Sequence, residues 1–310
     1  MRDITAVGEL LIDLTWTGTG EAGVPLYAAN PGGAPANVAV AAARLGARTA
    51  FVGKVGRDAF GRYLRRTLED NGVETAGLRE GALPTTLAVV SVDETGEREF
   101  SFLRGADWDL SPEEVDQRIL EESKILHFGS VTLTPGLCRS TTIFAARHAR
   151  AHGALVSYDP NYREKLWQDR AQAEQWMTMV LPLVDIIKLA REELPMVTGT
   201  DDLEEGSRRL EERGLSLVLV TLGAEGAFCR WQGECFTVPG VPVRVADTNG
   251  AGDAFLGAVL ARLCRRGDRP LEGLTAGELA DIAAYANRAA ALTCSRPGAI
   301  PALPTAEELS

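Results

Sequence analysis

The chain has 310 residues, 45% of them hydrophobic, and can therefore bury the core of one large α/β domain with a small appended unit. Its 43 acidic and 32 basic residues give a formal net charge of -11, which argues against a broad surface for nucleic acid or anionic membrane. Any anionic ligand must then be held by a local site. Residues 1–14 lack the basic and apolar regions of a signal peptide, and no later segment could span a bilayer, so we expect a cytoplasmic protein.

The cysteines and histidines do not form a recognisable metal or disulfide pattern. The five cysteines are widely spread and contain no C-x-x-C pair, so neither a disulfide framework nor a structural zinc site is indicated. His148 and His152 could share one helix face, but no third ligand stands at motif spacing. A surface helix is therefore the preferred interpretation of this pair.

Apolar runs of strand length alternate with helical patterns, which predicts a mostly parallel sheet covered by helices on both faces. The predicted strands cover residues 4–7, 49–52, 125–128, 154–158, 186–189 and 217–221. The predicted helices cover residues 36–45, 140–152 and 203–213. Each of these helices stops at a glycine suited to a left-handed C-terminal cap, namely Gly46, Gly153 and Gly214.

Two stretches interrupt this alternation with short strands around turns. The candidate strands cover residues 10–17 and 27–29 in the first stretch and 86–92 and 98–103 in the second. Residues 93–96 are a candidate hairpin turn. A small antiparallel sheet built from both stretches would make a lid. We therefore expect one discontinuous unit over residues 1–310, with the lid at about 11–34 and 85–106.

Ligands of open α/β sheets bind beyond the carboxyl ends of the strands, where loops present polar groups. Polar residues follow several of the predicted strands here. They are Gly129-Ser130, Asp159-Pro160-Asn161, Lys188 and Thr221-Leu222-Gly223. We therefore expect a binding site along this edge of the sheet.

The most informative segment is Asp247-Thr248-Asn249-Gly250-Ala251-Gly252-Asp253, which leads into a predicted helix over residues 254–264. Glycines ahead of a helix let its first N–H groups face a ligand, and the positive end of the helix dipole favours phosphate. Asp253 alone could be an ordinary helix cap. Beside a phosphate-binding turn, its carboxylate can instead accept the proton of an attacking hydroxyl while the turn neutralises charge on a transferred phosphoryl group.

A second segment, Pro31-Gly32-Gly33-Ala34-Pro35-Ala36-Asn37, runs into an alanine-rich helix. Its glycines permit close approach of a small ligand, and Asn37 offers a donor and an acceptor suited to sugar hydroxyls. Asp13 adds a carboxylate that can accept two hydroxyl hydrogen bonds. Each of these residues, taken alone, is equally explained as a turn or helix-start residue.

Taken together, the Gly-Gly-x-x-x-Asn helix start and the Asp-Thr-x-Gly-Ala-Gly-Asp turn resemble the two signature regions of the ribokinase-like (PfkB) family, in the same order and at the same separation. The similarity continues through residues 51–58, 159–161, 220–223 and 298–301. It thus covers nearly the whole chain. The resemblance implies a ribokinase-like α/β core with a β lid, ATP and Mg²⁺ as co-substrates, and transfer of the γ-phosphate to a primary sugar hydroxyl.

Carried over position by position, the resemblance implies Asp253 as the catalytic base and the Gly250-Ala251-Gly252 turn as the anion hole. The implied sugar-binding residues are Asp13, Gly32, Gly33, Asn37, Arg104, Asp159, Asn161 and Arg163. The implied nucleotide-binding residues are Lys188, Thr221, Gly223, Gly226, Asn249, Gly252 and Asn287.

Two positions depart from the family pattern, and both concern metal ions. Asn249 replaces the usual second Thr of the signature, where it and Asp247 would bind a monovalent cation such as K⁺. The family's Asn-x-x-Glu magnesium motif falls at residues 190–193, where Ala190 replaces the Asn and Glu193 keeps the carboxylate. Because Mg²⁺ is commonly held through waters and phosphates with few protein ligands, we still assign it to Glu193.

Within the family, the chain is most similar to fructokinases, so D-fructose is the expected acceptor. This similarity rests on residues 159–163 with 166–167, residues 96–100 ahead of Arg104, and residues 298–304. A 2-keto-3-deoxygluconate kinase is the alternative. Arg104 and Arg163 could pair with a substrate carboxylate, but they could equally hydrogen-bond ketose hydroxyls or the incoming phosphate.

Other classes of protein explain the sequence less well. Residues 18–23 match G-x-G-x-x-G, but no helix is predicted after them, so a dinucleotide-binding dehydrogenase is not supported. A non-catalytic sugar-binding module would use the same pocket, yet it has no use for a base beside a phosphate site. Exposed edges of the lid sheet favour a homodimer, and we expect the lid to close over the sugar and exclude water.

Overall fold

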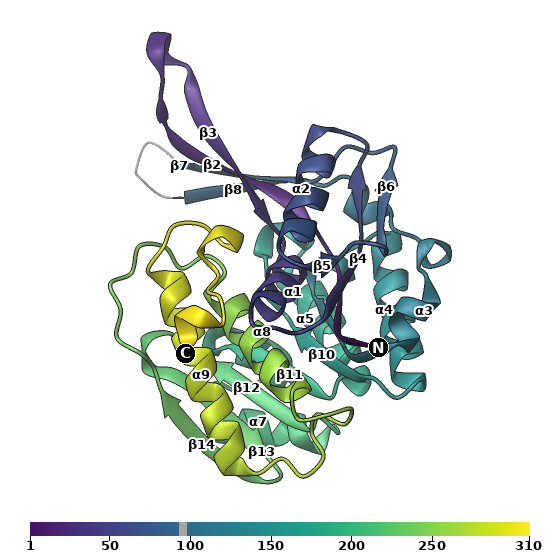
Figure 1. Ribbon diagram of the computed structural model, residues 1–310, viewed down its shortest axis with the longest axis vertical. Helices are drawn as coiled ribbons and strands as arrows, with labels where there is room; N and C mark the ends of the chain where they lie inside the picture. The colour runs from purple at the N-terminus through teal and green to yellow at the C-terminus, as the bar shows by residue number, and fades with distance from the viewer. Residues whose placement is uncertain (93–97) are drawn as a thin grey trace.

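A computed structural model describes residues 1–92 and 98–310, and a large twisted sheet runs through its centre (Figure 1). Its strands are β1 (Arg2–Val7), β4 (Thr49–Gly56), β5 (Val73–Glu74), β6 (Leu78–Gly81), β9 (Ser123–Gly129), β10 (Leu155–Asp159), β11 (Ile186–Ala190), β12 (Leu217–Thr221), β13 (Gly226–Trp231) and β14 (Glu234–Pro239). Their order is β14-β13-β12-β11-β10-β9-β1-β4-β5, with β6 also paired to β4. The strands from β12 to β5 are parallel, whereas β13 and β14 run antiparallel at one edge.

The six strands predicted from the apolar runs are confirmed as neighbours in this parallel row. Residues 4–7 lie in β1, where Ile4 stands opposite Thr49 of β4 on one side and Ile125 of β9 on the other. The pairs β9 with β10, β10 with β11 and β11 with β12 complete the row. The carboxyl ends of these strands therefore meet at one edge of the sheet.

Helices cover both faces of this sheet. They are α1 (Ala34–Arg44), α2 (Ala59–Asp70), α3 (Gln117–Glu121), α4 (Leu137–Ala151), α5 (Arg170–Met179), α6 (Leu194–Thr198), α7 (Leu203–Glu212), α8 (Ala251–Cys264) and α9 (Ala276–Cys294). Ile125 packs into a core shared with α1, α8 and α9, whereas its neighbour Leu126 packs into the core shared with α4 to α7. This burial on both faces explains why the strands are continuous apolar runs. The mostly parallel, helix-covered fold is confirmed.

The predicted glycine stops are also confirmed. Gly46, Gly153 and Gly214 follow α1, α4 and α7 with φ angles of 90°, 90° and 98°. These are left-handed conformations that glycine adopts without steric cost, and they end a helix. In the described part of the chain, no helix has the length and hydrophobicity that a membrane span requires.

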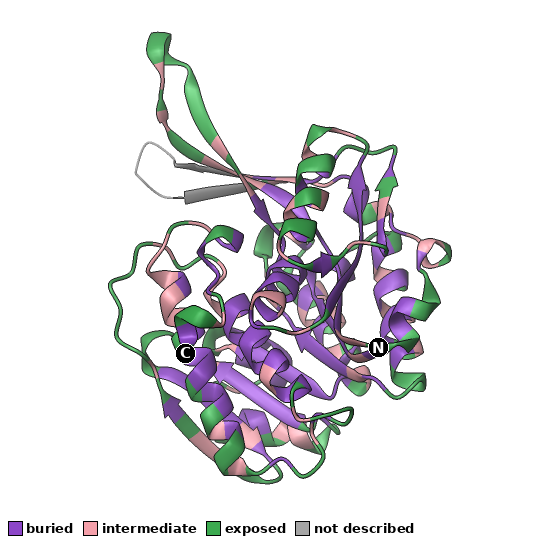
Figure 2. Ribbon diagram, viewed as in Figure 1, coloured by how far each residue is buried: buried purple, intermediate pink, exposed green. Residues whose placement is uncertain are grey.

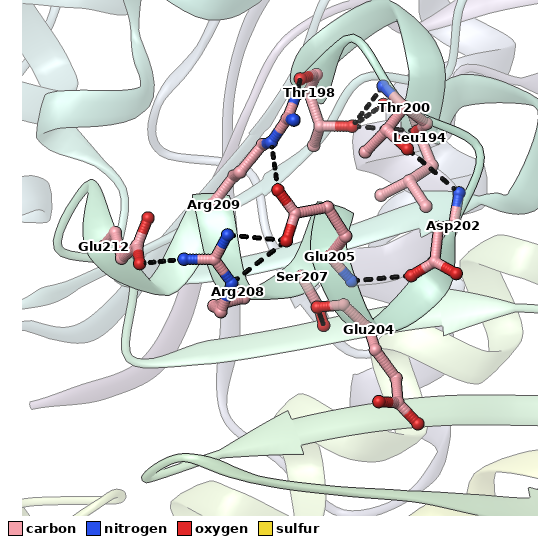
Figure 3. Close-up of polar contacts among 10 residues, drawn as sticks. All are labelled: Leu194, Thr198, Thr200, Asp202, Glu204, Glu205, Ser207, Arg208, Arg209 and Glu212. Carbon is pink, nitrogen blue, oxygen red and sulfur yellow. Dashed lines mark hydrogen bonds and ion pairs between the residues drawn. The ribbon is translucent and has the colours of Figure 1, made fainter.

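Polar contacts around α7 show how this helix is started and joined to α6 (Figure 3). The Asp202 carboxylate accepts a hydrogen bond from the N–H of Glu205 at 2.8 Å, which caps the helix. Glu205 in turn accepts hydrogen bonds from Arg208 and Arg209 one turn later. Arg209 also donates to the carbonyl of Thr198 at 3.0 Å, and this contact ties α7 to the end of α6.

A separate four-stranded sheet projects from the main one, and its β2–β3 hairpin extends farthest from the core (Figures 1 and 2). It contains β2 (Leu11–Thr19), β3 (Pro25–Gly32), β7 (Leu87–Val92) and β8 (Arg98–Leu103), in the order β3-β2-β7-β8. The pairs β2 with β3 and β7 with β8 are antiparallel, as expected. The central pair β2 with β7 is parallel, because both strands leave the main sheet at the carboxyl ends of the parallel strands β1 and β6.

Two turns predicted in this sheet have different outcomes. Residues 18–23, which match G-x-G-x-x-G, form the exposed tip of the β2–β3 hairpin with a single short turn at Glu21–Gly23. They open no α-helix, so the context that a dinucleotide site requires is missing. The turn predicted at residues 93–96 lies outside the described residues.

Candidate active site

The centre of the site lies where α1 and α8 begin side by side. Asn37 in the first turn of α1 donates a hydrogen bond from Nδ2 to Oδ2 of Asp253 in the first turn of α8, at 2.7 Å. One turn farther along both helices, a Cβ at Gly257 would stand only 2.6 Å from the Cβ of Ala41. Glycine at 257 therefore allows the close packing that joins Asn37 to Asp253. Gly257 was not predicted as a site residue, although a glycine inside a helical pattern is often explained by packing.

Asp253 is only 9% exposed, and its pKa is raised to about 6. Burial is the main cause and the charge of Asp159 adds to it, while the hydrogen bond from Asn37 and the charges of Lys188 and Arg163 lower the pKa. A carboxylate with a pKa close to the operating pH is suited to accepting a proton. The other amide atom of Asn37, Oδ1, is buried and has no hydrogen-bond partner among the described residues. It can therefore accept a hydrogen bond from a ligand hydroxyl.

A second carboxylate, Asp13 on β2, reaches the same space. Burial raises its pKa to about 6, the charge of Arg163 lowers it and the charge of Asp253 raises it further. Arg163, Asp13 and Asp253 are therefore close enough for their charges to influence one another. Gly32 at the end of β3 lies directly against the Asp13 carboxylate, so a side chain there would overlap it. Gly33, which precedes α1 with a φ of 112°, has a conformation that favours glycine.

The start of α8 provides a cluster of donors. Gly250 has a left-handed φ of 77°, and the helix begins at Ala251. The first N–H groups of a helix have no acceptor within it, and the helix dipole favours negative charge there. The side chain of Lys188 on β11 lies over this turn, since a Cβ at Gly252 would stand 2.6 Å from its Nζ. The N–H of Ala251 donates to the carbonyl of Thr248 at 3.3 Å, and the N–H groups that follow it lie beside the ammonium, an arrangement that suits phosphate oxygens.

Lys188 is held in place by a buried ion pair at the edge of the sheet. Its Nζ lies 2.9 Å from Oδ2 of Asp159 at the end of β10. Burial lowers the pKa of Lys188, but the charges of Asp159 and then Glu193 outweigh it and raise the pKa above its usual value. Glu193 is itself buried, and burial together with the charge of Asp159 raises its pKa. The lysine therefore stays protonated between two acidic groups.

Glu193 also fastens the two loops that follow β10 and β11. Its carboxylate oxygens accept hydrogen bonds from the N–H of Tyr162 at 2.6 Å and of Ala190 at 2.7 Å. In the first of these loops, Asn161 has a left-handed φ of 42°, and its N–H donates to Asp159 at 3.1 Å. Arg163 follows this bend, and the charge of its exposed side chain lowers the pKa of both Asp13 and Asp253. Glu193 thus has a structural function besides any contact with a metal ion.

The residues predicted for the nucleotide pocket lie at the far end of the same edge. Thr221 ends β12, and Gly223 and Gly226, with φ angles of 59° and 107°, form the tight turn into β13. Asn287 on α9 is buried and donates to the carbonyls of the last two residues of β14, at 3.1 and 3.0 Å. It therefore anchors the end of β14.

Asp247 and Asn249 lie in the loop before α8. The carboxylate of Asp247 accepts hydrogen bonds from the N–H of Asn249 at 3.1 Å and from the N–H of Gly298 at 3.0 Å. Asp247 therefore connects this loop to the segment after α9. The remaining lone pairs of its carboxylate, and the side-chain oxygen of Asn249, are the groups that could coordinate a cation.

Arg104 has a different set of contacts. It pairs with Asp107 at 2.8 Å and donates to the hydroxyl of Thr134 at 3.0 Å. Its charge also lowers the pKa of Glu9, which burial raises to about 8. The structure thus places Arg104 in a charged group at the base of the second sheet, and it contacts this group rather than Asp13 and Asp253. No motif indicated a function for Glu9, which lies between the apolar strand β1 and the apolar residues 10–12.

Comparison with known proteins gives consistent matches over the whole chain. A family model described as pfkB family carbohydrate kinase matches residues 1–306. Fructokinase-1 from Oryza sativa subsp. japonica is 40% identical over 314 residues, which cover 99% of this chain and 96% of that protein. A solved fructokinase with bound ATP from Xylella fastidiosa has a TM-score of 0.91 at 32% identity, covering 100% of this chain and 97% of that one. A double mutant of fructokinase from Vibrio cholerae O395, in a form with fructose, ADP and potassium ion bound, has a TM-score of 0.88 at 36% identity, covering 99% and 96%.

Proposed function

The chain belongs to the pfkB family of carbohydrate kinases, and we propose that it transfers the γ-phosphate of ATP to a primary hydroxyl of D-fructose, giving fructose 6-phosphate. The relatives reported above are named fructokinases, and one of them was solved with fructose and ADP. The observation that carries the proposal is the position of Asp253, in the first turn of the helix whose N–H groups and neighbouring Lys188 suit a phosphate.

The chemical step needs a base, an acceptor position and charge neutralisation. The primary hydroxyl donates a hydrogen bond to Asp253, and its oxygen attacks the γ-phosphorus. A new bond forms between this oxygen and the γ-phosphorus, and the bond between the γ-phosphorus and the β,γ-bridging oxygen breaks. ADP is the leaving group, and the hydroxyl proton passes to Asp253. General-base help of this kind contributes about 10² to 10⁴ in rate.

The chain's own groups hold the two substrates around this step. Asn37 Oδ1 and the Asp13 carboxylate accept hydrogen bonds from sugar hydroxyls. Asn37 contacts Asp253 directly, and its Oδ1 has no other partner among the described residues. Asp13 is close enough to Asp253 for the two charges to interact. The Gly250-Ala251-Gly252 turn and Lys188 neutralise charge on the transferred group. The remaining sugar-binding residues of the proposal are Gly32, Gly33, Asp159, Asn161 and Arg163, and the nucleotide-binding ones are Thr221, Gly223, Gly226, Asn249 and Asn287.

Two cation sites belong to the proposal. Asp159 and Glu193 are buried acidic neighbours, and the charge of Asp159 raises the pKa of Glu193, so a divalent cation beside them would relieve repulsion. We assign Mg²⁺ to Glu193, with contact through water because both carboxylate oxygens already accept N–H groups. When bound, the ion neutralises negative charge on the phosphates. A monovalent cation is assigned to Asp247 and Asn249.

Fructose is preferred over 2-keto-3-deoxygluconate because the two candidate arginines are already opposed by acidic groups. Arg104 pairs with Asp107 at 2.8 Å, and Arg163 faces the carboxylates of Asp13 and Asp253. A substrate carboxylate would add a further negative charge to this acidic space. Neutral ketose hydroxyls carry no such cost and can use the carboxylate and amide oxygens as acceptors.

The second sheet is proposed to act as a lid and as the contact between two copies of the chain. Residues 11–34 and 85–106 make up this lid, and Asp13 and Gly32 of the sugar site lie on its strands β2 and β3. Much of its projecting hairpin is exposed (Figure 2), and several of the exposed residues are large and apolar. They are Trp16, Val24, Leu26 and Tyr27. Contact with the same hairpin of a second copy would cover them.

Light scattering tests the homodimer directly. The wild type should have twice the mass of one chain at micromolar concentration, and the Leu26→Glu, Tyr27→Glu double variant should be a monomer. A monomeric wild type would remove this part of the proposal and leave the catalytic part untouched.

A coupled ADP-release assay tests the catalytic proposal. Mg-ATP is offered with fructose, glucose, ribose, adenosine or 2-keto-3-deoxygluconate, to the wild type and to Asp253→Asn. Turnover that depends on fructose and is lost in the variant supports the proposal. A preference for the keto acid would turn Arg104 and Arg163 into carboxylate ligands, and sugar binding without turnover would make the protein a binding module.

A further inference from the structure

A histidine in the last turn of α4 and the histidine that directly follows this helix meet a glutamate from the end of α3. His148 and His152 are four residues apart, so they share one face of the helix. Glu121 ends α3, and α3 and α4 pack side by side (Figure 1). The carboxylate is 27 residues from His148 in sequence, which is why no motif spacing revealed it.

The distances among these three side chains are close to those of a metal site. His148 Nε2 lies 2.9 Å from Glu121 Oε1, and His152 Nε2 lies 3.8 Å from the same oxygen. One ligand atom from each residue lies within 4.8 Å of the others. In a tetrahedral zinc site with bonds of about 2.1 Å, neighbouring ligand atoms are about 3.4 Å apart. The distances of 2.9 and 3.8 Å lie on either side of this value, so small side-chain movements would complete the site.

The orientation of His152 is also suited to a ligand. Its Nδ1 lies 2.8 Å from the backbone carbonyl of His148, so Nδ1 carries the proton of the neutral ring and donates it to this carbonyl. The lone pair is then on Nε2, the atom that faces Glu121. A hydrogen bond from the second ring nitrogen to a carbonyl is the usual arrangement of metal-binding histidines, because it fixes both the tautomer and the ring orientation.

We propose that Glu121, His148 and His152 form a binding site for a zinc-like divalent transition ion, which joins the end of α3 to the last turn of α4. Two imidazoles and one carboxylate suit Zn²⁺, with water in the fourth position. Glu121 and His152 are 37% and 44% exposed, so an ion can reach them from solvent. Binding replaces the hydrogen bond between His148 and Glu121 with two bonds to the metal.

This site stabilises the fold and takes no part in the phosphoryl transfer. Glu121 lies just before the start of β9, and His152 just before the start of β10, so the ion binds at the amino ends of these strands. Asp159, at the other end of β10, belongs to the catalytic edge. The proposed site is thus separated from that edge by the length of the strand. It does not depend on the proposed function.

Titration of the full-length chain with Zn²⁺ or Co²⁺ alone tests the proposal. We expect one ion per chain by calorimetry, a rise in Tm, and visible Co²⁺ absorption typical of a tetrahedral N/O site. His152→Ala and Glu121→Gln should each weaken zinc affinity by about 10- to 100-fold or more. Because His152 is exposed, the metal-free Tm of its variant should match that of the wild type.

Glu122→Gln is the matched control, because this neighbouring carboxylate pairs with Arg2 at 3.0 Å and lies outside the three-residue group. It should bind zinc as the wild type does. The proposal is overturned if no ion binds, or if both His152→Ala and Glu121→Gln keep the wild-type affinity. The second result would place the bound zinc outside this three-residue group.

Discussion

The amide of Asn37 donates a hydrogen bond to the carboxylate of Asp253 across the interface between α1 and α8, at 2.7 Å. This hydrogen bond lowers the pKa of a carboxylate that burial raises, and it fixes the position of both side chains. The amide oxygen remains without a partner among the described residues. In the proposed reaction, Asn37 would thus connect sugar binding with the basicity of Asp253.

Asp253→Asn should lower kcat by about 10² to 10⁴ or more, because an amide cannot accept the hydroxyl proton. ATP affinity should change little, since the N–H groups of α8 and Lys188 remain in place. Steady-state kinetics and calorimetric titration with ATP measure the two effects. Asp281→Asn, a change at an exposed acid on α9, is the control and should leave both unchanged. A variant that keeps most of its kcat would show that Asp253 is not the base.

The pH dependence of kcat/KM should show an acidic limb at about 6, because Asp253 and Asp13 both have pKa values raised to about 6 and Asp253 acts as its anion. Asn37→Ala removes a hydrogen bond that lowers the pKa of Asp253. The limb should therefore move to higher pH, while KM for the sugar rises through the loss of the amide oxygen. A limb that stays in place or moves to lower pH would contradict the geometry.

Gly252→Ala should raise KM for ATP and lower kcat together. The added Cβ would stand 2.6 Å from Nζ of Lys188, so the ammonium must move away from the anion-binding turn. A displacement of about 1 Å at a catalytic centre can cost as much as 10²-fold in rate. Gly277→Ala in the first turn of α9 is the matched control, because its new Cβ would meet no described atom within 4 Å. Equal kinetics for the two variants would exclude a function of Lys188 at this turn.

Lys188→Met should destabilise the fold by about 3 to 5 kcal/mol, because it leaves Asp159 buried without its partner. Adding Asp159→Asn should recover most of this loss, since no buried charge of the pair then remains. Both the single and the double variant should be inactive, because both lack the ammonium that lies over the Gly250-Ala251-Gly252 turn. Urea unfolding and the ADP-release assay measure the two effects separately. Recovery of activity in the double variant would assign Lys188 a purely structural function.

The fold was predictable because its strongest features are local. Each parallel strand is buried on both faces, so it appears as an apolar run, and several of the following helices end at a glycine such as Gly153. The strands β13 and β14 were not predicted. Arg230 and Glu234, together with a tight turn at Gln232 and Gly233, interrupt their apolar pattern at the exposed edge of the sheet.

The site was predictable where one segment supplies the geometry and not where distant segments meet. The Gly250–Gly252 turn and the following helix start lie within a few residues, so local rules apply. The contact between Gly257 and Ala41 depends on how two helices pack, and Glu121 meets His148 only after α3 and α4 are placed. Arg104 is a similar case, because its partner Thr134 comes from a segment 30 residues away.

Glu9→Gln should make the protein more stable, and the gain should grow with pH. Burial raises the pKa of Glu9 from 4.5 to about 8, so between these values the folded chain holds a proton that the unfolded chain has released. The stability contributed by Glu9 is therefore fully present below about pH 4.5 and is lost as the pH rises towards 8, by up to about 1.4 kcal/mol per pH unit. Glutamine is neutral throughout, and its amide oxygen can still accept a hydrogen bond from the N–H of Ala34, which in the wild type donates to Glu9 at 3.0 Å.

The measurement for Glu9→Gln is the difference in free energy of unfolding between variant and wild type from about pH 4.5 to 8. Other titrating groups, such as His127 with its pKa lowered to about 4 by burial, affect both proteins equally and cancel. A difference that does not change with pH would show that Glu9 is ionised in the folded protein, with Arg104 as its counter-ion.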